Sequence, residues 1–130
     1  MTLLKRKIDE FLLQWKDNPH KMPLIVKGAR QIGKTASIRN FARNNYKYIV
    51  EINFVLQKQF KDIFDDGFEV DTIIKNISLK RPDSEFVAGE TLIFFDELQE
   101  CMNCATSLKS FRLDGRYDVI CSGSLSGNRV

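Results

Sequence analysis

The sequence predicts a three-layer α/β/α fold, in which helices cover both faces of a parallel sheet. Short apolar runs that favour strands alternate along the chain with longer segments whose apolar residues recur at helical spacing. The run Leu92–Phe95 is apolar throughout, which is typical of a central strand buried on both faces. Because right-handed crossovers join parallel strands, the alternation predicts helices on both faces of the sheet.

Length and composition indicate one globular domain. Residues 1–130 are expected to form a single unit, with a helix and linker over residues 1–20 and the core over residues 21–130. Hydrophobic residues make up 43% of the chain, which argues against disorder. The net charge of +3 is small and its Lys and Arg are interleaved with acids, so nucleic acid is not indicated.

The N-terminal segment predicts a packing helix and no export signal. Residues 2–16 carry an apolar stripe at helical spacing, formed by Leu4, Ile8, Phe11, Leu12 and Trp15. The basic run Lys5–Lys7 is followed by Ile8–Glu10 in place of the apolar core of a signal peptide, and no apolar segment is long enough to span a membrane. We therefore expect a cytoplasmic protein that does not enter the membrane.

A phosphate-binding pattern follows the first predicted strand, residues 23–27. Residues 28–35 read GARQIGKT, which fills the pattern G-x-x-x-x-G-K-[ST] without a gap. The glycines allow backbone N–H groups to turn toward anionic oxygens, and the helix predicted next directs its positive dipole end at them. An ordinary glycine-containing turn is the weaker interpretation. The pattern predicts a P-loop NTPase fold that binds a nucleoside triphosphate.

Each position of this loop has an expected role. Lys34 reaches the β and γ phosphates as a point charge and assists catalysis, and the Thr35 hydroxyl ligates Mg²⁺. Backbone groups at the loop and the start of the helix surround the phosphates. The predicted nucleotide-binding positions are Gly28, Ala29, Arg30, Gln31, Ile32, Gly33, Lys34, Thr35 and Ala36.

The middle of the chain supplies a second strand and two helices. The β-rich run 48–54 predicts a strand. Residues 57–64 are read as a helix that ends at the turn Asp65–Gly67, and residues 70–79 as a helix closed by Arg81 and Pro82. Residues 83–90 form a polar connection to the buried run Leu92–Phe95.

An acidic pair, Asp96 and Glu97, comes directly after that buried strand. Ligands bind at the carboxyl ends of strands in open α/β sheets, so Asp96 is assigned to Mg²⁺ through water. Glu97 is assigned as the general base that polarises the attacking water. The alternative is that the pair caps a following helix. The preceding phosphate loop favours the functional interpretation.

The last segment predicts a helix over residues 103–111, a turn at Asp114–Gly115 and a strand over residues 117–121. Cys101 and Cys104 form a C-x-x-C pair, but a zinc site would need two further ligands. Cys121 and His20 are both distant in sequence. We therefore expect ordinary reduced cysteines.

Four segments carry a family likeness: residues 28–35, 94–99, 107–109 and 117–124. Together they resemble the AAA-type P-loop ATPases of bacteria and archaea, in which an N-terminal ATPase core precedes a C-terminal domain of unknown function. The resemblance implies ATP and Mg²⁺ as cofactors, ATP hydrolysis as the parent activity, and Gly28–Thr35 and Asp96–Glu97 as Walker A and B motifs. It also implies that strand 117–121 lies between the phosphate-loop and acidic-pair strands.

The resemblance implies further site residues. Ser122 or Ser124 would lie beside the γ phosphate as a polar sensor, and a plain turn leaving the strand is the alternative. Asn53 is similar to the polar switch residue that hydrogen-bonds the catalytic glutamate, and capping of a turn is its alternative. Trp15 is expected to pack in the core, with stacking on adenine as the alternative.

The chain also departs from the family pattern. A complete core carries a fifth strand, an arginine finger and a helical lid, whereas this sequence stops at Val130 and Arg129 matches none of these positions. We expect a core truncated after its fourth strand, which binds nucleotide and turns it over weakly. A catalytically silent nucleotide-binding or interaction module is the alternative. The phosphate-loop strand would form an exposed edge, open to self-association or a protein partner.

Overall fold

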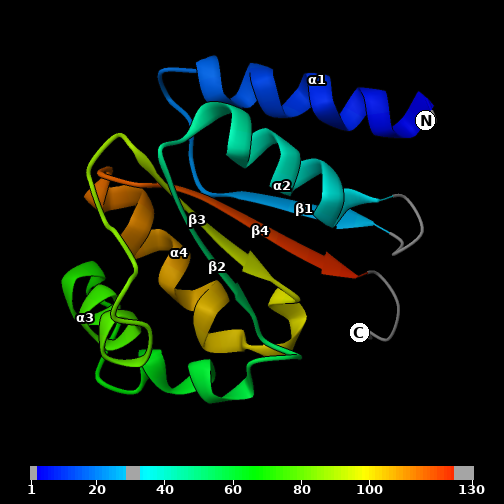
Figure 1. Ribbon diagram of the computed structural model, residues 1–130. Helices are drawn as coiled ribbons and strands as arrows, with labels where there is room; N and C mark the ends of the chain where they lie inside the picture. The colour runs from blue at the N-terminus through cyan, green and yellow to red at the C-terminus, as the bar shows by residue number, and fades with distance from the viewer. Residues whose placement is uncertain (1–2, 29–32, 125–130) are drawn as a thin grey trace.

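A computed structural model describes residues 3–28 and 33–124 of the protein. Its strands form one parallel four-stranded sheet in the order β1–β4–β3–β2 (Figure 1). The strands are β1 (Leu24–Gly28), β2 (Tyr48–Asn53), β3 (Thr91–Asp96) and β4 (Asp118–Ser124). The predicted fold class is confirmed, as is the placement of the last strand between the phosphate-loop and acidic-pair strands.

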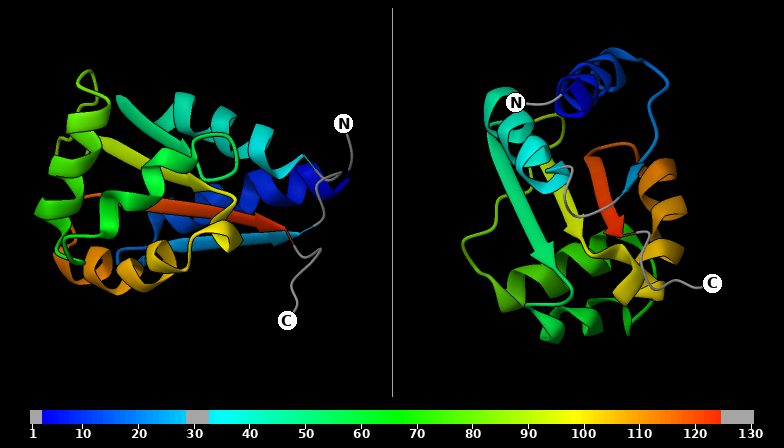
Figure 2. Two further views of the ribbon diagram at one scale, coloured as in Figure 1. Left: turned by 90° about the horizontal axis from the view of Figure 1, so that it is seen from below. Right: turned by 90° about the vertical axis from the view of Figure 1, so that its right-hand side faces the viewer.

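Helices cover both faces of this sheet, which completes three layers (Figure 2). One face carries α1 (Leu3–Asp17) and α2 (Lys34–Asn45). The other carries the 3₁₀ helix η2 (Lys58–Phe64), α3 (Val70–Lys80) and α4 (Met102–Asp114), with the short 3₁₀ turn η3 (Leu98–Glu100) after β3. Within the described ranges, the helices are too short or too polar to cross a membrane.

The predicted N-terminal packing helix contributes to the core on the α1–α2 face. The buried residues of this core are Leu12, Ile38, Phe41, Ala42, Tyr46, Leu92, Phe94 and Ile120. The Trp15 ring packs edge-on against Phe41, with 6.4 Å between ring centroids, and its Nε1 donates to the Met22 carbonyl at 2.9 Å. Trp15 is therefore partly buried and packs against this core.

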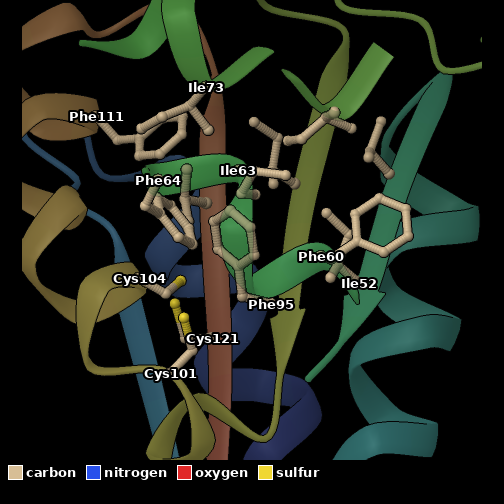
Figure 3. Close-up of a cluster of buried hydrophobic side chains, with 14 of the residues drawn as sticks. Ile52, Phe60, Ile63, Phe64, Ile73, Phe95, Cys101, Cys104, Phe111 and Cys121 are labelled. Carbon is tan, nitrogen blue, oxygen red and sulfur yellow. The ribbon is translucent and has the colours of Figure 1, made fainter. Parts of the chain in front are cut away.

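The core on the α3–α4 face is built around Phe95 of β3 (Figure 3). The Phe95 ring is fully buried and stacks on Phe54, with 5.8 Å between centroids and 18° between planes. Its centroid lies 6.2 Å from that of Phe64 and 6.0 Å from that of Phe111. Because every residue of β3 is buried, the sequence prediction of a central strand covered on both faces is confirmed.

The three cysteines meet at the lower end of this core (Figure 3). All three are free thiols and buried, and Cys104 on α4 lies beside Cys121 on β4. Burial, and then the neighbouring Cys121 thiol, raises the pKa of the Cys104 thiol well above its ordinary value. Burial also raises the pKa of Cys101. Cys101 and Cys104 therefore stay as neutral thiols near neutral pH.

We expect the folded protein to resist thiol reagents. The cysteine thiolate attacks an aromatic disulfide reagent, so burial of the three thiols and the raised pKa of Cys101 and Cys104 both slow the reaction at about pH 8. In concentrated denaturant the 3 cysteines should react fully. Absorbance of the released thiolate gives both rates. Rapid modification of the folded chain would contradict the buried placement.

Two boundaries differ from the sequence prediction. The segment after β2 is a 3₁₀ helix, in which Phe60 and Ile63 lie three residues apart and are both buried in the core. The last strand continues to Ser124, beyond the predicted end at Cys121. Ser122 and Ser124 are therefore strand residues paired with β1, and the alternative of a turn leaving the strand does not hold.

Strand β1 forms one edge of the sheet as described. It pairs with β4 along its inner side, from Leu24 opposite Ile120 to Gly28 opposite Ser124. Ile25 is 40% exposed, and Lys27, also exposed, is a residue type that discourages sheet extension at an edge. Association through this edge stays a prediction.

Candidate functional site

The carboxyl ends of all four strands bring the predicted site residues to one edge of the sheet. Gly28 at the end of β1 pairs with Ser124 of β4. Asn53 at the end of β2 pairs with Asp96 of β3. Residues separated by more than 90 positions in the sequence thus share one edge, because parallel strands all end on the same side.

The helix that follows the phosphate loop begins at this edge. Gly33 has φ of 74°, a left-handed conformation that glycine adopts without strain, and its carbonyl accepts the first helical bond from Ser37 N at 3.0 Å. Lys34 is the first residue of α2 and is 6% exposed; Thr35 is half-buried and Ala36 exposed. The other predicted loop positions, Ala29, Arg30, Gln31 and Ile32, lie outside the described residues.

Three donors hold the Asp96 carboxylate, which is 6% exposed. The Ser122 hydroxyl donates to Asp96 Oδ1, and Asn53 Nδ2 donates to Oδ2 at 3.2 Å. The backbone N–H of Glu97 also donates to Oδ1, at 2.9 Å. A buried carboxylate that accepts several bonds is fixed in orientation and satisfied electrostatically. Asp96 is therefore pre-positioned at the edge.

Asn53 lies at the end of β2. The resemblance implied a hydrogen bond from Asn53 to Glu97; in this structure the Asn53 amide donates to Asp96, and a switch role toward Glu97 stays a prediction. Its Oδ1 accepts from the backbone N–H groups of Val55 and Leu56 at 2.8 and 2.9 Å, so it also caps the turn after β2. The register explains this, because Asn53 lies directly opposite Asp96, one residue short of Glu97.

Glu97 takes an unusual backbone conformation immediately after the buried strand. Its φ of 63° is the one positive value among the described non-glycine residues. Its side chain is half-buried, and Oε1 accepts a bond from Gln99 Nε2 at 2.7 Å. The backbone therefore leaves the strand direction at Glu97, directly after β3 ends at Asp96.

Comparison with known proteins identifies the family. The model of the family described as AAA domain matches residues 20–129. The chain belongs to the AAA domain family. Among solved structures, that of C. elegans PCH-2 resembles this AAA domain with a TM-score of 0.49 and 16% sequence identity. The likeness covers 98% of this chain, which spans 36% of the length of that chain. Among curated proteins, none matches.

The donors of this nucleotide-binding AAA domain suit magnesium chemically. Mg²⁺ prefers oxygen ligands and is held in nucleotide sites by one or two protein groups together with phosphate oxygens. Asp96 supplies a fixed carboxylate and Thr35 a hydroxyl at the start of α2. Within residues 3–28 and 33–124, no cluster of three or more His, Cys, Asp or Glu could hold a metal ion by itself.

The sequence left open whether Ser122 or Ser124 is the polar sensor, and the structure gives the two serines different surroundings. The Ser122 hydroxyl is fully buried and bonds the Asp96 carboxylate. Ser124 lies at the end of β4, and its backbone N–H donates to Gln99 Oε1 at 3.3 Å. Ser122 therefore orients Asp96, whereas Ser124 lies farther toward the carboxyl edge of the sheet.

Sequence reasoning gave no role to Gln99, although the residue belongs to one of the segments that carry the family likeness. Its side chain contacts both Glu97 and the end of β4. The contact with β4 joins residues 25 positions apart. A local pattern carries no signal for it, because it depends on the β3–β4 pairing.

Proposed function

We propose that this AAA domain binds ATP with Mg²⁺ at the carboxyl edge of its sheet and hydrolyses the γ-phosphoanhydride bond. The observation that carries the proposal is the Asp96 carboxylate, buried and held by Ser122 and Asn53 at the same edge as the start of α2. Burying a carboxylate costs free energy that hydrogen-bond donors must offset, and a structural cap would not require that burial. The family match over residues 20–129 supports the nucleotide as the ligand.

Binding depends on the loop and the helix that follows it. Lys34 would neutralise the β and γ phosphates, and the N–H groups at the start of α2 would donate to their oxygens. Asp96 and Thr35 would hold Mg²⁺ together with phosphate oxygens. When bound, the ion supplies charge neutralisation for the transferring phosphoryl group.

In the proposed hydrolysis, Glu97 acts as the general base. The carboxylate would accept a proton from the attacking water while the water oxygen forms a bond to the γ phosphorus and the bond to the leaving ADP oxygen breaks. The products are ADP and inorganic phosphate. Gln99 Nε2 donates to Glu97 Oε1 at 2.7 Å, which orients the carboxylate that would accept this proton.

We expect Lys34→Ala to weaken Mg-ATP binding by about 100-fold, because the phosphates lose a charge-assisted contact. Isothermal titration calorimetry of the intact chain measures this directly. The matched control is Arg43→Ala, which removes one positive charge from the exposed end of the same helix.

The control protein should bind Mg-ATP with the affinity of the unmodified chain. Circular dichroism and thermal melting check that both variants remain folded. Equal affinity for Lys34→Ala and the unmodified chain would refute the proposed nucleotide site. Equal weakening in both variants would point to general electrostatic attraction.

A further inference from the structure

The side chain of Gln99 bridges two strand ends at the proposed site. Gln99 belongs to η3, the single turn after β3, and is half-buried. Its Nε2 donates to Glu97 Oε1 at 2.7 Å, and its Oε1 accepts from the backbone N–H of Ser124 at 3.3 Å. The first contact lies at the end of β3 and the second at the end of β4.

The chemistry of the two partners sets the orientation of this amide. An ionised carboxylate oxygen only accepts hydrogen bonds, so the NH₂ group of Gln99 must face Glu97. A backbone N–H only donates, so the carbonyl oxygen of the amide must face Ser124. Reversing the amide would break both contacts at once, and Gln99 therefore has one favourable orientation.

Gly123 makes room for this bridge. A Cβ built at position 123 would lie 3.3 Å from Gln99 Oε1, closer than ordinary side-chain contacts. The strand β4 thus passes the amide at a distance that only glycine accepts without a shift. Two neighbouring residues of β4 therefore accommodate the Gln99 amide, Gly123 by its lack of a side chain and Ser124 by its backbone N–H.

We propose that Gln99 is a positioning residue for Glu97. This inference rests on the proposed hydrolytic function. Glu97 has a long side chain and a left-handed backbone conformation. The Asn53 amide donates to Asp96. Gln99 holds the Glu97 carboxylate through one end of its amide and takes its own position from β4 through the other. Glu97 is therefore placed by the strand that lies between the phosphate-loop strand β1 and the acidic-pair strand β3.

The test is a substitution that removes both bonds and keeps the length of the side chain. We expect Gln99→Met to lower the single-turnover rate of Mg-ATP hydrolysis by about 10-fold and to leave the dissociation constant for Mg-ATP unchanged. The control is Glu100→Gln, an exposed neighbour in the same turn, which should retain the full rate. An unchanged rate for Gln99→Met, or a loss of affinity instead, would overturn the assignment.

A double-mutant cycle separates positioning from a general structural effect. In a Glu97→Gln background, adding Gln99→Met should cause no further loss, because Gln99 acts through the carboxylate that is already absent. A second loss of similar size would overturn the proposal. Gly123→Ala disturbs the same contact from β4 and should also slow hydrolysis at unchanged affinity.

The two proposals fail in different ways. If Glu97→Gln hydrolyses ATP as fast as the unmodified chain, the proposed hydrolytic role of Glu97 is wrong. If Glu97→Gln is slow while Gln99→Met and Gly123→Ala are both as fast as the unmodified chain, the role of Glu97 stands and the role of Gln99 is wrong. Thermal melting of every variant identifies any that fails to fold.

Discussion

Replacing Glu97 by Gln is expected to lower the single-turnover rate of ATP hydrolysis by about 10³-fold, within the range for loss of a general base. The amide has the size of the carboxylate but cannot accept the proton of the attacking water. The proposed phosphate contacts come from α2 and its preceding loop, so the affinity for Mg-ATP should stay within about twofold. Rapid-quench measurement with enzyme in excess over ATP separates the chemical step from product release.

The matched control for this prediction is Glu100→Gln. Glu100 is exposed and carries the same charge three residues away, so its loss tests for a general electrostatic effect. A rate for Glu97→Gln equal to that of the unmodified chain would remove the catalytic interpretation. Nucleotide binding with no measurable hydrolysis by the unmodified chain would instead favour a catalytically silent binding module.

Truncating Phe95 to Ala is expected to lower the free energy of unfolding by about 3–5 kcal/mol. The ring is fully buried and packs against Phe54, Phe64 and Phe111, so its removal leaves a cavity that three other rings line. Domains of this size are stable by only about 5–15 kcal/mol, so much of the total stability would be lost. Urea unfolding followed by tryptophan fluorescence and circular dichroism measures the difference.

The control for the core prediction is Phe11→Ala. Phe11 lies on α1 and is 52% exposed, so the same chemical change should cost about 1 kcal/mol or less. Equal losses in the two variants would show that the Phe95 cluster is not the centre of the core. A large loss for Phe95→Ala alone would confirm the packing around β3.

Local patterns in the sequence were enough to predict the main elements. The phosphate loop is contiguous, so residues 28–35 identify it without knowledge of the fold. The buried run Leu92–Phe95 and the helical stripes are also short-range signals, since they follow from the periods of strands and helices. The 3₁₀ form of η2 was missed because a three-residue spacing fits both helix types.

Contacts between strand ends could not be predicted from local sequence patterns. Asn53 bonds Asp96 because β2 and β3 pair in a register that no local pattern specifies. The meeting of Cys104 with Cys121 likewise depends on the packing of α4 against β4. The sequence did not predict this contact, since the two cysteines are distant along the chain.

The sequence by itself determined that this protein is an α/β domain with a phosphate loop and an acidic pair after a buried strand. Those features are set by neighbouring residues and by residue type. Only the tertiary structure decided how the acidic pair is held: Ser122 and Asn53 on Asp96, and Gln99 on Glu97. The two bonds to Asp96 form across parallel strands, where partners far apart in sequence become neighbours once the sheet order and register are established. Gln99 is only two residues from Glu97, but it also contacts β4 through the Ser124 N–H.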